Sequence, residues 1–179
     1  SVSGHKIHAV KGVGALYQKN GVHLHPTFHG GSQERGLRPG TESVPLIAAF
    51  GAAVQTYGGN IRERYQLVAE KKAYLLEQLH TIPHCKIHSA ADASPYIINF
   101  SMRPYRSEIL LHFLEKRDVF VSSGSACSKG KNSGVPVLFG ATEQETDSIL
   151  RVSLSADTPN EALDALISGL QAAKETLLY

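Results

Sequence analysis

Residues 1–17, SVSGHKIHAVKGVGALY, contain an unusual group of polar residues: Lys6 follows Ser3 and His5 within four positions. A lysine amine acts as a nucleophile only where burial or neighbouring positive charge lowers its pKa. A hydroxyl and an imidazole beside it are suited to binding a phosphate while the amine condenses with an aldehyde. The alternative is a solvated lysine next to a loop. These few residues do not decide between the two.

The composition is that of a globular protein. Apolar residues make up 42% of the 179 positions, and the formal net charge is only +2. No apolar run reaches the roughly 20 residues that a membrane span needs, and the mixed charges argue against a dedicated nucleic-acid surface. Cys85 and Cys127 are the only cysteines. Without a visible secretory signal, we expect both to be reduced thiols in a cytoplasmic protein.

The first third of the chain is rich in glycine. Strands are expected at 14–18 and 22–25, joined by a tight turn, and a loop at 29–41. Apolar residues at helical spacing from Val44 to Val54 predict a helix. The pair Gly58 and Gly59 follows it, and we place a domain boundary there, between a first domain of residues 1–58 and a second of residues 59–179.

The second domain alternates helices and strands. A long amphipathic helix is predicted over 61–79, a helix over 107–117 capped by Ser107, and a last helix capped by Thr158 with Glu161 closing a capping box. Strands are expected at 85–89, 96–102, 118–123 and 149–155. This pattern predicts a two-layer α/β sandwich.

Cys127 lies in SSGSACSKGK (122–131), a run of small residues that contains Lys129 and Lys131. Such a loop exposes a thiol, and nearby cations favour the reactive thiolate. An inert, buried thiol is the alternative. Cys85, on a predicted strand, is better explained as a core residue.

Three further sets of side chains suit ligands. His23, His25 and His29 lie in one short stretch, and the first two, at i and i+2 of a predicted strand, could hold Zn or Ni together with a third ligand, although surface or loop histidines explain them equally well. Thr41 is the last residue of the loop at 29–41, whose arginines are suited to binding an anion. Arg151 lies in the apolar strand ILRVSLS and needs a partner, which is either an acidic residue of the chain or the carboxylate of a ligand.

Read together, the motifs resemble one family. SGHKIHAVKGVGALY, HGGSQERGLRPGT, SSGSACS and ILRVSLS occur in the order found in the C-terminal half of cysteine desulfurases. These are pyridoxal-phosphate enzymes of the class-V aminotransferase group, with fold type I architecture. Two backbone-setting positions depart from the family pattern, with Val10 in place of a proline and Ser32 in place of a glycine.

The resemblance implies roles for six residues. Lys6 resembles the lysine that binds the cofactor aldehyde, and Ser3 and His5 resemble contacts of the cofactor phosphate. Thr41 resembles the threonine that reaches the phosphate of the neighbouring subunit's cofactor, which implies a homodimer. The resemblance also makes Arg151 the residue that pairs with the substrate α-carboxylate, and Cys127 the residue that receives sulfur as a persulfide.

The implied reaction converts L-cysteine to L-alanine and passes sulfur to an acceptor protein. The acceptor pathway, such as iron–sulfur cluster assembly or tRNA thiolation, is left open. The resemblance also implies that the chain is the end of the cofactor-binding large domain plus a small C-terminal domain, and we expect this part alone to be inactive. Alternatives are a selenocysteine lyase, another class-V enzyme, or a non-catalytic interaction module.

Overall fold

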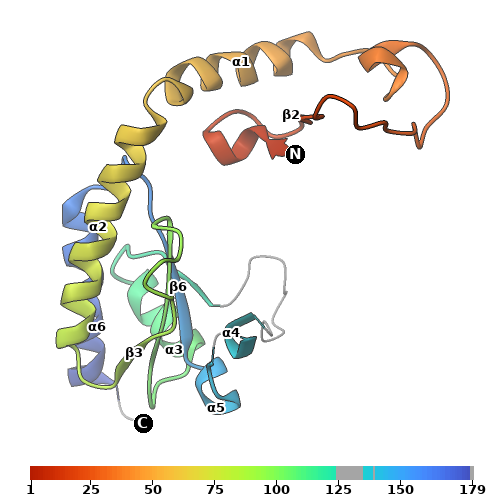
Figure 1. The fold of residues 1–179 in the computed structure, drawn as a ribbon. Helices are drawn as coiled ribbons and strands as arrows, with labels where there is room; N and C mark the ends of the chain where they lie inside the picture. The colour runs from red at the N-terminus through yellow and green to blue at the C-terminus, as the bar shows by residue number, and fades with distance from the viewer. Residues whose placement is uncertain (124–134, 139, 178–179) are drawn as a thin grey trace. The chain divides into compact units, whose positions relative to one another are not determined.

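A computed structural model describes residues 1–123, 135–138 and 140–177. The chain divides into two compact units, Ser1–Ile61 and Arg62–Tyr179, which are treated one at a time. Figure 1 shows the ribbon with both units. In the part of the chain that the structure describes, no helix has the length and apolar character needed to cross a membrane.

The first unit contains little regular structure before its helix. Two short antiparallel strands pair, β1 (Val2–Ser3) with β2 (Gly14–Ala15), and between them runs the 3₁₀ helix η1 (Gly4–Ile7). A second 3₁₀ helix, η2 (Gln33–Gly36), lies in the predicted loop. The strand expected at 22–25 is wrong, because these residues form no ladder and are exposed.

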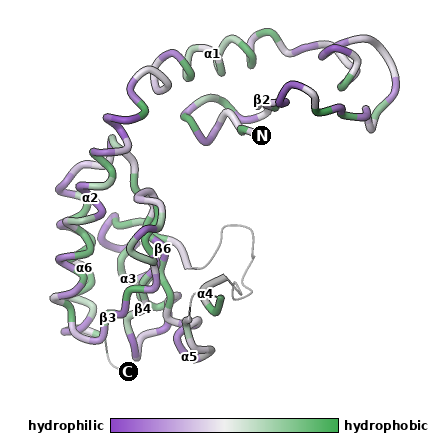
Figure 2. The backbone as a smooth tube through the Cα atoms, viewed as in Figure 1, coloured by the Kyte–Doolittle hydropathy of each residue, from purple (hydrophilic) through white to green (hydrophobic). Residues whose placement is uncertain are grey.

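The helix α1 (Val44–Gly58) completes the first unit and confirms the helix predicted from Val44. Pro45 lies in its first turn, where a missing N–H costs no hydrogen bond. Its sequence is apolar along much of its length (Figure 2), yet Ala53 is its only buried residue. The unit therefore has almost no core of its own.

The second unit is a four-stranded antiparallel sheet with helices. The sheet order is β3–β4–β6–β5. The strands are β3 (Cys85–Ile87), β4 (Ile97–Met102), β5 (Ser122–Ser123) and β6 (Ile149–Ser153), and the helices are α2 (Ile61–Thr81), α3 (Ser107–Glu115), α4 (Val135–Leu138), α5 (Glu143–Thr146) and α6 (Asn160–Thr176). Each pair of neighbouring strands in this sheet is antiparallel.

The two faces of this sheet differ sharply in chemistry. Alternate residues of a strand point to opposite faces. One face carries apolar residues that join α2, α3 and α6 in one core: Ile98, Phe100, Met102, Leu150 and Val152. In Figure 1, α2 and α6 lie on one side of the sheet and α4 and α5 on the other. The expected two-layer packing of helices on a sheet is present in this unit.

The opposite face is mostly polar, with Ile97 and Ile149 as its apolar members, and is named here the polar face. It carries Lys86 on β3, Asn99 and Ser101 on β4, Ser122 on β5 and Arg151 on β6. Residues paired across neighbouring antiparallel strands share a face. Arg151 pairs with both Asn99 and Ser122 and therefore stands at the centre of a cross-strand row.

The predicted helix caps are wrong in detail. Arg106, not Ser107, occupies the N-cap of α3, and Ser107 is the first helical residue. Pro159 takes the N-cap position of α6, while the Thr158 hydroxyl accepts a hydrogen bond from the Ser155 backbone N–H at 2.9 Å. The Thr158 side chain is thus used to close the turn before the helix.

Candidate functional site

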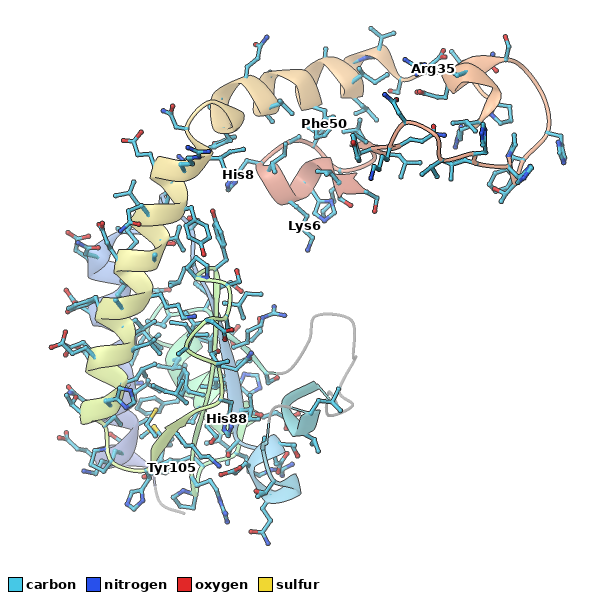
Figure 3. The ribbon with its side chains drawn as sticks, in the orientation of Figure 1. Lys6, His8, Arg35, Phe50, His88 and Tyr105 are labelled. Atoms are coloured by element: carbon cyan, nitrogen blue, oxygen red, sulfur yellow. The ribbon has the colours of Figure 1, made fainter. Side chains whose placement is uncertain are left out.

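The turn that carries Lys6 is held by backbone bonds. The Gly4 N–H donates to the Val13 carbonyl at 2.8 Å, and the Ala9 N–H donates to the Gly4 carbonyl at 3.1 Å. His8 ends η1 in the left-handed region, at φ 65°. The chain therefore reverses immediately after Lys6, and the lysine is fixed on a short, defined turn (Figure 3).

Gly4 is required by this packing. It is buried, and a Cβ placed on it would lie 3.0 Å from the Val13 carbonyl oxygen and 3.2 Å from Cδ2 of Phe50 on α1. The His8 ring lies 4.6 Å from the ring of Tyr57, which anchors the other end of the turn to the same helix. The sequence Ser-Gly-His-Lys thus folds against α1 with its glycine inward.

The polar groups of the turn point to solvent. Ser3, His5 and Lys6 are exposed, and the Ser3 hydroxyl makes no cap hydrogen bond. Within the described chain, Lys6 has neither a hydrogen bond nor an ion pair. A hydroxyl, an imidazole and an unpaired amine are therefore presented together on one rigid turn.

Thr41 lies between the arginine-containing loop and α1. Glu34 and Arg35 have left-handed backbone conformations, and the Gly40 N–H donates to Oε1 of Gln33 at 3.2 Å. Arg38 donates to the carbonyl of Pro39. The loop is thus tightly folded, and Thr41 is exposed at its end.

Arg151 is the central residue of the polar face. Its Nη2 donates to Oγ of Ser122 at 3.3 Å, and its buried Nε has no hydrogen-bond partner in the described chain. The sequence-based alternative, an ion pair with an acidic residue, is absent between Arg151 and the residues that the structure describes. A buried, unpaired donor of a guanidinium is costly unless a ligand satisfies it.

The other charged groups on this face are already paired. Lys86 donates to Glu145 of α5 at 2.7 Å, and Nε2 of His88 lies 2.7 Å from Oγ of Ser101. Hydrogen bonds from Lys86 and from the Thr142 backbone lower the pKa of Glu145 to about 2, and burial lowers the pKa of His88. Figure 3 shows His88 on the side of the sheet away from α2 and α6.

Sequence reasoning missed these two pairs. Glu145 closes a capping box with Thr142, whose backbone N–H donates to Oε2 of Glu145 at 2.8 Å. The signal was present, since Thr-x-x-Glu is the capping-box pattern. His88 and Ser101 meet only through the strand register, for which a single sequence contains no local signal.

The remaining sequence candidates divide into two groups. Cys127, together with Lys129 and Lys131, lies outside the described residues. His23, His25 and His29 are described and exposed, and in the part of the chain that is described no three His, Cys, Asp or Glu residues are close enough to hold a metal ion. Burial raises the pKa of the Cys85 thiol to about 11, as suits an unreactive packed thiol.

Comparison with known proteins places this geometry in a family. The family model described as aminotransferase class V matches residues 1–166. A protein of Clostridium botulinum strain Hall named cysteine desulfurase IscS is 35% identical over 176 residues, covering 95% of this chain and 44% of the relative. The chain thus spans about half the length of the curated relatives it matches.

Solved structures agree with the family match. A structure titled NifS-like protein superposes with a TM-score of 0.84 at 27% identity, covering 98% of this chain and 45% of that one. A structure titled SspA in complex with cysteine has a TM-score of 0.62 at 30% identity, covering 85% and 42%. The chain belongs to the class-V aminotransferase family, and the α/β fold expected from the resemblance is confirmed.

The residues of the lysine turn fit the cofactor of this family, pyridoxal phosphate. An amine without a partner in the described chain is the group that binds an aldehyde, and the exposed Ser3 hydroxyl and His5 imidazole beside it are suitable phosphate ligands. Gly4, which has no room for a side chain, brings these groups together on one turn.

Proposed function

We propose that the polypeptide carrying this chain is a pyridoxal-phosphate-dependent cysteine desulfurase. One observation carries the substrate assignment: the buried Nε of Arg151 has no partner in the described chain. A guanidinium binds a carboxylate with two parallel hydrogen bonds. The relatives named cysteine desulfurase, and the SspA structure titled as a complex with cysteine, support L-cysteine as the molecule that supplies this carboxylate.

Lys6, Ser3, His5 and Thr41 are the proposed cofactor ligands in this chain. Lys6 holds the aldehyde carbon, and Ser3 and His5 donate to the phosphate. The proposal places Thr41 on the phosphate of a second subunit's cofactor, so that the enzyme is a homodimer. The cofactor, when bound, supplies an electron sink conjugated to the substrate amine. A free Lys6 amine would hold and move a proton at the substrate carbon.

Cys127 is the proposed sulfur acceptor. Its thiolate attacks Sγ of the substrate, an S–S bond forms, and the Cβ–Sγ bond of the substrate breaks. A proton then replaces sulfur on Cβ, so one thiol and one cysteine give one persulfide and one alanine. Ser122, the partner of Arg151 in the ladder, is five residues before Cys127. This short separation in sequence from the ladder partner of Arg151 supports the role proposed for Cys127.

The experiment uses the full-length polypeptide loaded with pyridoxal phosphate. Borohydride reduction followed by peptide mapping should place the cofactor on Lys6. We expect Lys6→Ala to lose both this adduct and alanine formation. Lys11→Ala, a change to another exposed lysine of the same segment, should keep both. A cofactor attached elsewhere would overturn the proposal.

Two variants separate the other roles. Arg151→Ala should keep the adduct and raise the KM for L-cysteine about 100-fold, because a charge-assisted pair of hydrogen bonds is lost. Cys127→Ser should keep the adduct and form no persulfide. Comparing alanine release from cysteine and selenocysteine tests the substrate: a strong preference for selenocysteine would contradict a desulfurase.

Partners and location are further parts of the proposal. The persulfide would be passed to an acceptor protein, and iron–sulfur cluster assembly is supported by the IscS name of the Clostridium relatives. Transfer toward tRNA thiolation is the other route proposed. A cytoplasmic location is proposed from the free, half-buried thiol of Cys85, which suits a reducing compartment.

A further inference from the structure

Asn99 stands directly beside Arg151 on the polar face. The two residues are register partners between β4 and β6. The Asn99 backbone N–H donates not to β6 but to Oγ of Ser89, at 2.8 Å, and its carbonyl accepts from the His88 N–H at 2.8 Å. Both backbone groups of Asn99 thus point away from β6, and the pair is of the non-hydrogen-bonded kind, whose side chains lie closest.

The Asn99 side chain is half-buried and unused. Its amide makes no hydrogen bond to any residue that the structure describes, although an amide can make several. The neighbouring polar groups on the face differ in this respect, since Lys86 is paired with Glu145 and His88 with Ser101. Two donors without a protein partner in the described chain therefore lie on neighbouring strands of this face: the half-buried Asn99 amide and the buried Nε of Arg151.

Such a pair of donors has a definite chemical complement. The amide N–H₂ and the guanidinium Nε both donate, so the ligand that satisfies them must be an acceptor, and two neighbouring acceptor oxygens can each take one donor. A carboxylate offers two acceptor oxygens, and the positive charge of Arg151 favours an anion. Ser122, on the other side of Arg151, already accepts from Nη2 and fixes the plane of the guanidinium.

We propose that Asn99 is a second binding residue for the substrate carboxylate, donating its side-chain amide to one carboxylate oxygen while Arg151 binds the other. This inference rests on the proposed function, which assigns the carboxylate to Arg151. It adds a residue that determines how tightly and in which orientation an α-amino acid is held. Asn99 binds the substrate and takes no part in bond making or breaking.

The test uses the full-length enzyme loaded with pyridoxal phosphate. Asn99→Ala should raise the KM for L-cysteine about tenfold with little change in kcat, since one hydrogen bond to a charged group is lost. Asn99→Asp should raise it further, because it places a second negative charge against the carboxylate. Ser153→Ala, a change to an exposed residue of β6 on the same face, is the matched control and should leave KM unchanged.

A binding measurement separates recognition from folding. Absorbance titrations of the cofactor with L-alanine and with ethylamine compare ligands with and without the carboxylate. Asn99→Ala should weaken L-alanine about tenfold and leave ethylamine unchanged. Equal weakening of both ligands, or of neither, would overturn the role of Asn99. If Arg151→Ala in that case weakens L-alanine more than ethylamine, the proposed function stands and only this inference fails; if Arg151→Ala weakens both ligands equally, or neither, the carboxylate assignment itself is wrong.

Discussion

At the scale of single residues, two glycines of the first unit allow a direct comparison. Gly4 is buried below the lysine turn, where an added Cβ would meet backbone and a side chain at 3.0 Å, whereas a Cβ on Gly51 in α1 would meet nothing within 4 Å. Backbone atoms cannot move aside as the end of a long side chain can. The same one-carbon change should therefore have opposite effects at the two positions.

We expect Gly4→Ala to displace the turn and weaken cofactor binding by at least tenfold, with about 1–3 kcal/mol of destabilisation from overpacking. Gly51→Ala should be neutral or stabilising by up to about 1 kcal/mol, because alanine favours a helix over glycine. For both variants, absorbance titration of the full-length protein measures the cofactor affinity, and its Tm measures the change in stability. Unchanged cofactor affinity in Gly4→Ala would show that the turn tolerates a side chain.

Glu145 gives a prediction about acid stability. Its pKa is about 2 in the fold, against an ordinary value of 4.5, because Lys86 and the Thr142 backbone donate to the carboxylate. A folded pKa below the unfolded one gives stability that is complete above about pH 4.5 and is lost as the pH falls toward 2. Lys86 is half-exposed, so solvent screens the pair and the expected contribution is only about 1 kcal/mol.

Glu145→Gln should therefore lower the free energy of unfolding by about 1 kcal/mol at pH 7 and flatten its decline between pH 4.5 and 2. Denaturant titrations across this range provide the measurement. Glu161→Gln, at an exposed position in the first turn of α6, is the control and should keep the wild-type pH profile. An equal slope in wild type and Glu145→Gln would show that the carboxylate is not linked to folding.

At the scale of elements, helix positions followed from the sequence better than strands did. The apolar periodicity from 61 to 79 predicted α2, which runs Ile61–Thr81, because an α-helix satisfies its backbone within its own segment. A strand needs a partner. Residues 22–25 have a strand-like composition but form no ladder with any residue that the structure describes. Of the strand expected at 118–123, only the two residues of β5 pair with β6.

The residues of the candidate site could likewise be predicted only where the signal lies in their immediate neighbours in sequence. Arg151 was identified because an arginine in an apolar strand needs a partner, and that argument uses only its immediate neighbours. Asn99 carries no such signal, because its role depends on which residue of β6 it faces. Register is set by packing of a whole face, not by the residues of one strand.

The contact between α3 and α6 predicts how substitutions at the two helices combine in their effect on stability. A Cβ on Gly169 of α6 would lie 2.7 Å from Cδ2 of Leu114 on α3, and Leu114 is fully buried. We expect Leu114→Ala to cost about 2–5 kcal/mol through the cavity it leaves. Gly169→Ala should be neutral or destabilising alone, but stabilising in the Leu114→Ala background, where its methyl group enters that cavity.

The double-mutant cycle measures this coupling as the departure from additivity in the free energy of unfolding. A coupling of about 1 kcal/mol or more is expected for groups in direct contact. Additive effects would mean that the two helices do not approach each other at this point.

At the scale of the whole molecule, the two units differ in how much apolar surface they bury. In residues 1–61 only Gly4 and Ala53 are buried, and large apolar side chains are open to solvent, with Leu16 63%, Tyr17 83% and Phe28 68% exposed. In the second unit, eighteen residues from α2, α3, α6, the sheet and the segments that adjoin them form one buried cluster. Hydrophobic burial is the main driving force of folding, so the units should differ in independent stability.

We expect residues 60–179, expressed alone, to fold with a single cooperative thermal transition and dispersed amide NMR signals. Residues 1–61 alone should show neither, because burial of two small residues cannot offset the entropy of ordering the chain. Circular dichroism melts and ¹H–¹⁵N spectra of the two pieces test this. A cooperative transition in residues 1–61 would mean that the lysine turn is stable by itself; its absence would mean that the cofactor lysine depends on further protein surface packed against its unit, as expected if those apolar side chains are interface residues of a larger enzyme.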